Sequence, residues 1–123
     1  MAKSEAQVQA EIRTEAADKG MILWRNNSGM AFDRNGNAIR YGLANDSQQM
    51  NRKIKSSDLI GIRPVIITAD MVGKVIGQFM AVEVKAPPWT YKGTEREIAQ
   101  KKYIDLVESM GGWAKFADTV GEL

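Results

Sequence analysis

Two segments of the chain carry a complete signature for the start of a helix, and a stretch rich in short apolar runs and turn residues separates them. The signatures are Ser4-Glu5-Ala6-Gln7 and Thr94-Glu95-Arg96-Glu97. In each, a hydroxyl can cap the backbone N–H three residues on, while the Gln or Glu side chain reaches back. The pattern predicts helices over 4–19 and 94–110, ended by Gly20 and by Gly111-Gly112.

Five apolar segments predict strands. They are 21–26, 58–62, 65–68 and 74–85 before the late helix, and 113–117 after it. The segment 58–62 could also be a turn. Asn35-Gly36 is a strong signal for a hairpin with a type I′ turn. The polar, basic stretch 45–57 has no periodicity and is predicted to be a loop. Helix, strands, helix and strand in this order predict an α/β fold with a central mixed sheet flanked by helices.

Length and composition restrict both the architecture and the chemistry. A chain of 123 residues suits one compact domain, so we expect residues 1–123 to form a single domain. The sequence contains no Cys and no His. This excludes thiol nucleophiles, Ser–His–Asp triads, histidine bases and zinc sites built on either residue type. Any catalysis must therefore use carboxylates, Lys, Arg, Tyr, Ser or a metal ion.

Positive charge gathers in one part of the chain. Residues 19–63 carry eight Lys or Arg and three Asp. Such a region suits a polyanionic partner, although a solvated basic surface would look the same. No apolar run approaches the ~20 residues that a membrane span needs, and the first residues lack the apolar core of a secretory signal. We therefore expect a cytoplasmic protein without a membrane partner.

The segment Ala81-Val82-Glu83-Val84-Lys85 combines a buried-strand pattern with two charged side chains. Glu83 and Lys85 are two residues apart, so both project from the same face of the strand. Asp58 opens another apolar element. Two carboxylates and a backbone carbonyl are the hard oxygen ligands that Mg²⁺ or Mn²⁺ prefers. A cation held there can orient a water and offset charge on a phosphodiester transition state, and a lysine can stabilise the developing charge.

The order Asp58, then Glu83-Val84-Lys85, resembles the D…(D/E)XK signature of the PD-(D/E)XK nuclease superfamily. Glu-x-Lys is common by chance, but a wider set of motifs agrees with it. The set consists of Ser4-Glu5, Trp24-Arg25-Asn26-Asn27 with Gly29, Tyr41-Gly42, Ser57-Asp58-Leu59-Ile60-Gly61, Glu83-Val84-Lys85, and Gln100 with Tyr103. Together these motifs are similar to the VRR-NUC (virus-type replication-repair nuclease) family in its stand-alone, phage-like form. The resemblance extends over almost the whole chain.

This resemblance implies a restriction-endonuclease-like core and a Mg²⁺- or Mn²⁺-dependent DNA endonuclease. It implies that Asp58, Glu83 and the carbonyl of Val84 bind the metal ion. Lys85 would be the catalytic lysine, and Glu5 and Gln100 would join the site from the two helices. Structure-selective cleavage of branched DNA, such as Holliday junctions or flaps, follows from the same likeness. One small domain carries one active site, so a two-fold homodimer in the host cytosol would present the two sites needed to cut paired strands. The segment between Gly42 and Ser57 is longer than in many members, so no role is carried over to it.

Helix geometry gives separate support for Glu5. Residues at i, i+3 and i+7 lie on one face of a helix, so Glu5 shares a face with Val8 and Ile12. A carboxylate on an inward-facing stripe requires a reason, because burial of an unpaired charge is costly. The simpler interpretation is that Glu5 stabilises the helix N-terminus electrostatically.

Other residues have two interpretations each. Glu83 and Lys85 could be a solvated ion pair on an edge strand, and Gln100 a surface residue. Arg25 and Asn26 could contact a phosphate or close a turn. Arg52, Lys53 and Lys55 could form a DNA-binding arm or a solvated loop. Trp89 and Tyr91 could stack on unpaired bases, but packing over the sheet edge is favoured.

Three other functions remain open from sequence. The chain could be a non-catalytic DNA-binding module that keeps a nuclease fold. It could be a protein-interaction or inhibitor protein of phage type, or a nuclease that acts on RNA. Neither the preferred nucleic-acid structure nor the number of metal ions follows from the sequence.

Overall fold

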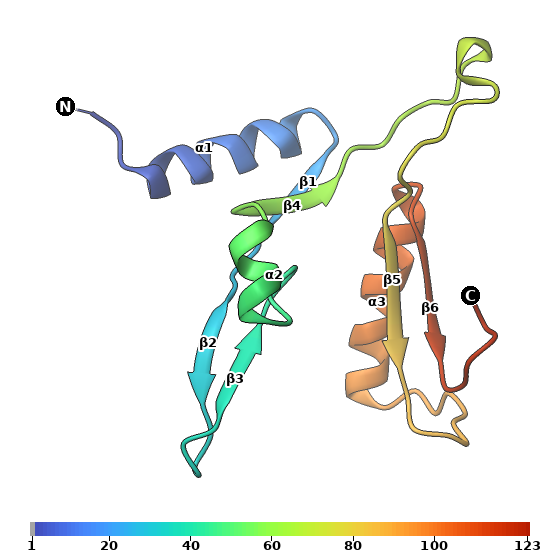
Figure 1. The fold of residues 1–123 in the computed structure, drawn as a ribbon. Helices are drawn as coiled ribbons and strands as arrows, with labels where there is room; N and C mark the ends of the chain where they lie inside the picture. The colour runs from blue at the N-terminus through green and yellow to red at the C-terminus, as the bar shows by residue number, and fades with distance from the viewer. Residues whose placement is uncertain (1) are drawn as a thin grey trace. The chain divides into compact units, whose positions relative to one another are not determined.

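Three α-helices and six short strands are interspersed along residues 2–123, which confirms the mixed α/β class (Figure 1). The structure, a computed structural model, describes residues 2–123. In order, these residues form α1 (Glu5–Asp18), β1 (Ile22–Arg25), β2 (Gly29–Phe32), β3 (Ala38–Tyr41), α2 (Gln48–Lys53), β4 (Leu59–Ile62), the 3-10 helix η1 (Ala69–Met71), β5 (Met80–Val84), α3 (Glu95–Ser109) and β6 (Trp113–Ala117). None of these helices is long and apolar enough to cross a membrane.

The chain divides into two compact units, which we describe separately. The N-terminal unit ends at Gly61, and the C-terminal unit is Ile62–Leu123. The predicted central mixed sheet is wrong: within residues 2–123 the strands form three two-stranded sheets, β1–β4, β2–β3 and β5–β6. Apolar composition predicts strands but does not specify which strands pair. The β2–β3 pair is antiparallel and the β5–β6 pair is parallel.

Both predicted capping boxes are present. The Ser4 hydroxyl accepts a hydrogen bond from the Gln7 N–H at 3.2 Å, and the Gln7 side chain accepts one from the Ser4 N–H at 2.8 Å. Thr94 and Glu97 make the same reciprocal pair at 3.1 and 3.2 Å. Local sequence therefore determines where α1 and α3 begin, since each signature needs only its own four residues.

The predicted hairpin is confirmed, but its type I′ turn is wrong. β2 and β3 pair in register from Gly29 opposite Tyr41 to Phe32 opposite Ala38. A type I′ turn requires positive φ at both central residues, whereas only Gly36 has it (φ +79°). The Asp33 carboxylate instead accepts hydrogen bonds from the backbone N–H groups of Asn35 and Asn37. This Asp-closed turn competes with the tighter turn that Asn-Gly alone would favour.

The stretch 45–57, predicted to be a loop, contains the helix α2. The Ser47 hydroxyl caps this helix by accepting from the Met50 N–H at 3.0 Å. Six residues are too few to show a periodic apolar face, so the pattern gave no signal. Ahead of α2, buried Asn45 donates to the carbonyls of Gly29 and Tyr41 and accepts from Arg40. This amide ties the stretch to the base of the hairpin.

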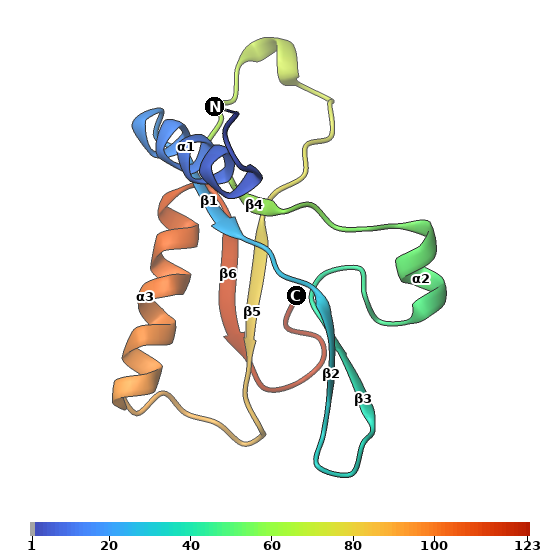
Figure 2. The ribbon, with the colours of Figure 1, turned by 90° about the vertical axis from the view of Figure 1, so that its left-hand side faces the viewer.

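In the C-terminal unit, α3 packs against the parallel pair β5–β6 (Figures 1 and 2). The buried side chains at this contact are Ile104, Val107, Ala114 and Ala117. Gly112 is required at the turn into β6, because a Cβ there would lie 2.6 Å from Cγ1 of Val107 and 3.0 Å from the Phe79 carbonyl oxygen. The predicted strand 113–117 and the glycine stop of α3 are therefore confirmed.

Two strand predictions in this unit are wrong. Residues 65–68 are not a strand, and the segment predicted over 74–85 is a strand only over Met80–Val84. Ile66 and Val75 are 87% and 97% exposed. These segments have the β-branched composition of strands, but composition does not supply the neighbouring strand that a ladder needs. Val84 is also exposed, so β5 is less buried than its apolar sequence predicts.

Candidate functional site

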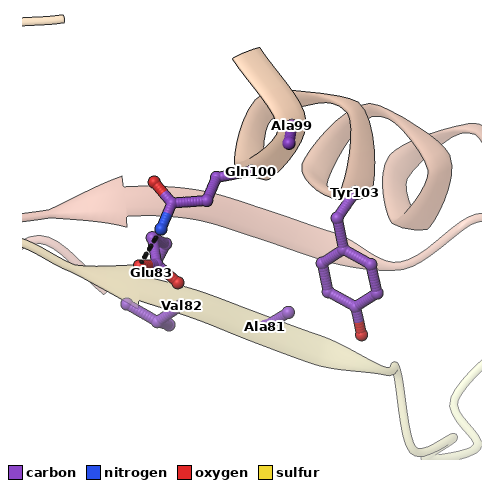
Figure 3. A pocket seen from close by; sticks show the side chains of 6 residues that line it. All are labelled: Ala81, Val82, Glu83, Ala99, Gln100 and Tyr103. Carbon is purple, nitrogen blue, oxygen red and sulfur yellow. Dashed lines mark hydrogen bonds between the residues drawn. The ribbon is translucent and has the colours of Figure 1, made fainter. Parts of the chain in front are cut away.

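Three polar side chains meet where β5 ends beside α3. The Gln100 amide donates from Nε2 to Oε1 of Glu83 at 2.7 Å and accepts at Oε1 from Nζ of Lys85 at 2.6 Å. Nζ of Lys85 lies 3.9 Å from Oε1 of Glu83. Figure 3 shows Gln100 reaching from α3 to Glu83 on β5. We call these three residues the Glu83–Gln100–Lys85 cluster.

Lys85 is the more enclosed of the two charged members. Its side chain is 15% exposed, against 39% for that of Glu83. Its backbone N–H donates to the Ala117 carbonyl at 2.9 Å, which extends the pairing of β5 with β6. The ammonium lies 5.8 Å from the ring centroid of Trp89 and 5.6 Å from that of Phe116. These distances are within the ~6 Å range of cation–π attraction.

An open pocket of 330 Å³ adjoins the cluster (Figure 3). Its lining consists of Ala81, Val82, Glu83, Ala99, Gln100 and Tyr103. The pocket wall is mostly apolar, and Glu83 and Gln100 provide polar groups at it. A small pocket with a few convergent polar groups is the usual form of a binding site.

Asp58 lies directly before β4 in the N-terminal unit and is exposed. Its carbonyl accepts a hydrogen bond from the Asn26 N–H at 2.8 Å, and the Asn26 side chain donates to the Ser57 carbonyl at 2.8 Å. Asn26 thus links the end of β1 to the segment before β4. Further along β4, Gly61 allows close approach to β1, because a Cβ there would lie 1.8 Å from the Ile22 carbonyl oxygen.

Glu5 occupies the first turn of α1 and is exposed. The face that it shares with Val8 and Ile12 is also exposed, and only Ala16 in this helix is buried. Within its own unit Glu5 is therefore not inward-facing. Glu5 and Asp58 belong to the N-terminal unit. Within the C-terminal unit, the structure brings the predicted site residues Glu83, Lys85 and Gln100 together.

The predicted nucleic-acid-binding residues are exposed, apart from Asn26. Arg25 ends β1, and Arg52 and Lys53 form the last turn of α2. Their positive charges interact favourably with the partial negative charge at the C-terminus of the helix. Lys55 donates to Oδ1 of Asn51 at 2.8 Å.

The ligand chemistry of β5 is compatible with a divalent cation. The half-exposed Glu83 carboxylate and the backbone carbonyl of Val84 are hard oxygen donors, which suit Mg²⁺ or Mn²⁺. The Glu83 carboxylate accepts a hydrogen bond from Gln100, whose side-chain oxygen in turn accepts one from Lys85. Such hydrogen-bonded support is typical of carboxylates that bind metals.

Sequence reasoning missed the buried carboxylate of Glu97, which is 7% exposed. The capping box predicted its contact with Thr94, but not the hydrogen bonds that it accepts from the Trp89 indole N–H and the Lys92 N–H. Burial raises the pKa of Glu97, but these hydrogen bonds, led by that from Thr94, outweigh it and lower the pKa below the ordinary value. The prediction that Trp89 packs over the sheet edge is confirmed by its contact with Phe116, with ring centroids 4.7 Å apart.

No known protein family, curated protein or solved structure matches the chain. The likeness to VRR-NUC nucleases thus stays a prediction from the motifs.

Proposed function

We propose that the chain is a metal-dependent nuclease that hydrolyses phosphodiester bonds in DNA. The observation that carries the proposal is the Glu83–Gln100–Lys85 cluster, in which a carboxylate and an ammonium are held at the end of one strand by a shared amide. An ion pair serving only as a solvated surface contact would need neither the amide nor the enclosure of the lysine. The order of the other motifs supports the same conclusion.

Each member of the cluster has a role in this proposal. Glu83, with the Val84 carbonyl and with Asp58, would hold Mg²⁺ or Mn²⁺. Such a cation supplies Lewis-acid chemistry, lowering the pKa of water and offsetting phosphate charge. Lys85 would donate to the attacked phosphate or to the nucleophilic water, because its ammonium is already oriented. Gln100 would hold the side chains of Glu83 and Lys85 in fixed positions relative to each other.

We propose a restriction-endonuclease-like core, and Glu5 as a further contributor to the site. Exposed Arg25, Arg52, Lys53 and Lys55 would contact DNA phosphates and make binding salt-dependent. A two-fold homodimer would present two sites, which suits cleavage of paired strands in branched DNA such as Holliday junctions or flaps.

A cleavage assay tests the proposal. Labelled four-way junction, flap and linear duplex of matched sequence are incubated with the protein and Mg²⁺ or Mn²⁺, or with EDTA. We expect metal-dependent cutting that Lys85→Ala, Glu83→Ala and Asp58→Ala abolish. Lys101→Ala is the matched control, because Lys101 is an exposed lysine of α3 paired with Asp105. Cutting that survives Lys85→Ala, or that persists in EDTA, would refute the assignment.

Binding without any cutting of these substrates, lost at high salt, would indicate a non-catalytic DNA-binding module instead. Matched RNA substrates separate the RNA-cleaving alternative. Light scattering tests the dimer, and a strictly monomeric protein with full junction-cutting activity would contradict it.

A further inference from the structure

Glu97 is a buried carboxylate that the proposed chemistry does not use. Its Oε2 accepts from Nε1 of Trp89 at 2.8 Å, and its Oε1 accepts from the N–H groups of Lys92 and Thr94 at 3.0 and 3.2 Å. Capping α3 requires only the bond to Thr94. The two further bonds hold the connector between β5 and α3 onto the start of that helix.

Trp89, in this connector, is fixed from three directions. Its indole N–H donates a hydrogen bond to Glu97, and its backbone N–H donates one to the carboxylate of Asp118 at 3.1 Å. Its ring packs on that of Phe116. Asp118 follows β6, so the tryptophan joins the ends of both strands to α3. A side chain with its donor, its backbone and its ring all engaged has little freedom to move.

The face of this fixed ring lies against the ammonium of Lys85. The ammonium lies 5.8 Å from the ring centroid of Trp89 and 5.6 Å from that of Phe116, beside the packed pair of rings, with Gln100 as its hydrogen-bond acceptor. A lysine side chain on a flexible stem loses orientation easily. The rings exclude alternative positions of Nζ without forming a competing hydrogen bond.

We infer that Trp89, fixed in place by Glu97, is a positioning residue for Lys85. Its ring holds the ammonium where Gln100 accepts its hydrogen bond, so the lysine is ordered before substrate arrives. The consequence for catalysis rests on the proposed nuclease function, whereas the placement of the ammonium does not. A displacement of about 1 Å in a reacting group can cost on the order of 100-fold in rate.

The test compares Trp89→Leu, Trp89→Phe and Glu97→Gln with the control Tyr91→Leu. Phe keeps an aromatic face but not the indole donor. Gln at 97 has only one side-chain acceptor oxygen and cannot serve Trp89, Lys92 and Thr94 as the carboxylate does. Tyr91 packs near Trp89 and Phe116, with ring centroids 6.3 and 6.0 Å away, and its ring is not over Lys85.

The first readout is the NMR chemical shift of the Lys85 ε-methylene protons in the full chain without DNA or metal, assigned with Lys85→Gln. Rings at these distances displace the resonance upfield. We expect Trp89→Leu to remove the share of this displacement that Trp89 contributes and to leave the share of Phe116, which is 5.6 Å away. Trp89→Phe should lose less, and Tyr91→Leu should keep all of it. An unchanged shift in Trp89→Leu would overturn the inference, whether or not the protein cuts DNA.

The second readout separates kcat from KM on a cleaved substrate. We expect kcat to fall on the order of 10- to 100-fold in Trp89→Leu, with partial recovery in Trp89→Phe, an intermediate loss in Glu97→Gln and an unchanged KM. Loss through KM alone would instead indicate that Trp89 contacts DNA and would overturn the positioning role. If the wild-type protein cuts no DNA but its Lys85 resonance responds as expected, the nuclease proposal fails and the positioning of Lys85 stands.

Discussion

Replacement of Gln100 by Ala tests whether the shared amide prepares Glu83 and Lys85 for catalysis. The substitution removes the donor to Glu83 at 2.7 Å and the acceptor for Lys85 at 2.6 Å. A hydrogen bond to a charged group contributes about 1.5–3 kcal/mol. The lower end of this range applies, because Glu83 is 39% exposed and water can replace its lost donor.

Lys85 keeps its other neighbours in this variant, namely Glu83 at 3.9 Å and the two rings. One bond of about 1.5 kcal/mol lost from the transition state corresponds to roughly a tenfold fall in kcat. We therefore expect Gln100→Ala to cut branched DNA about tenfold more slowly at saturating substrate. Single-turnover cleavage with excess enzyme measures this step directly.

Gln100→Glu distinguishes the acceptor role of the Gln100 side chain, toward Lys85, from its donor role, toward Glu83. A carboxylate at this position still accepts from Lys85, but it faces Glu83 with a like charge. Like charges repel at this distance, so we expect Gln100→Glu to displace Glu83 and to cut more slowly than the wild-type protein. Lys101→Ala, one residue along α3, is the control. Gln100→Ala with wild-type single-turnover rates, or with a loss that Lys101→Ala matches, would refute the role of the amide.

Three further predictions concern stability, measured by urea denaturation. Gly61→Ala should destabilise the protein by about 1–3 kcal/mol, because the added Cβ overpacks against the Ile22 carbonyl. Gly77→Ala is the control and should be nearly neutral, since nothing lies within 4 Å of its added Cβ. Equal effects of the two substitutions would contradict the close approach of β1 and β4. Asn45→Ala should cost about 1 kcal/mol for each lost hydrogen bond and speed amide exchange across the hairpin, and unchanged exchange would contradict its anchoring role. The pKa of Glu97 is lowered in the folded protein. The ionised carboxylate should therefore stabilise the fold fully above its ordinary pKa, and this stabilisation should be lost as pH falls through the folded-state pKa. A stability difference between the wild type and Glu97→Gln that grows in favour of the wild type below pH 4 would contradict this direction.

Local signals predicted the elements that depend on local contacts. The starts of α1 and α3 follow from Ser4-x-x-Gln7 and Thr94-x-x-Glu97, because each capping box closes within four residues. The glycine stop after α3 and the hairpin between β2 and β3 were predictable for the same reason. The segments 65–68 and 74–79 were not, because a strand exists only where another strand pairs with it, and apolar composition does not specify that partner.

For the site, sequence alone determined that Glu83 and Lys85 share one face of a strand, because side chains alternate with a period of two. It also determined, through the absence of His and Cys, which chemistries the chain cannot perform. Only the tertiary structure decided that Gln100 joins these two charges and that Trp89 closes over the lysine. Those contacts bridge separations of up to 17 residues and depend on how α3 packs on β5 and β6, which no local pattern specifies.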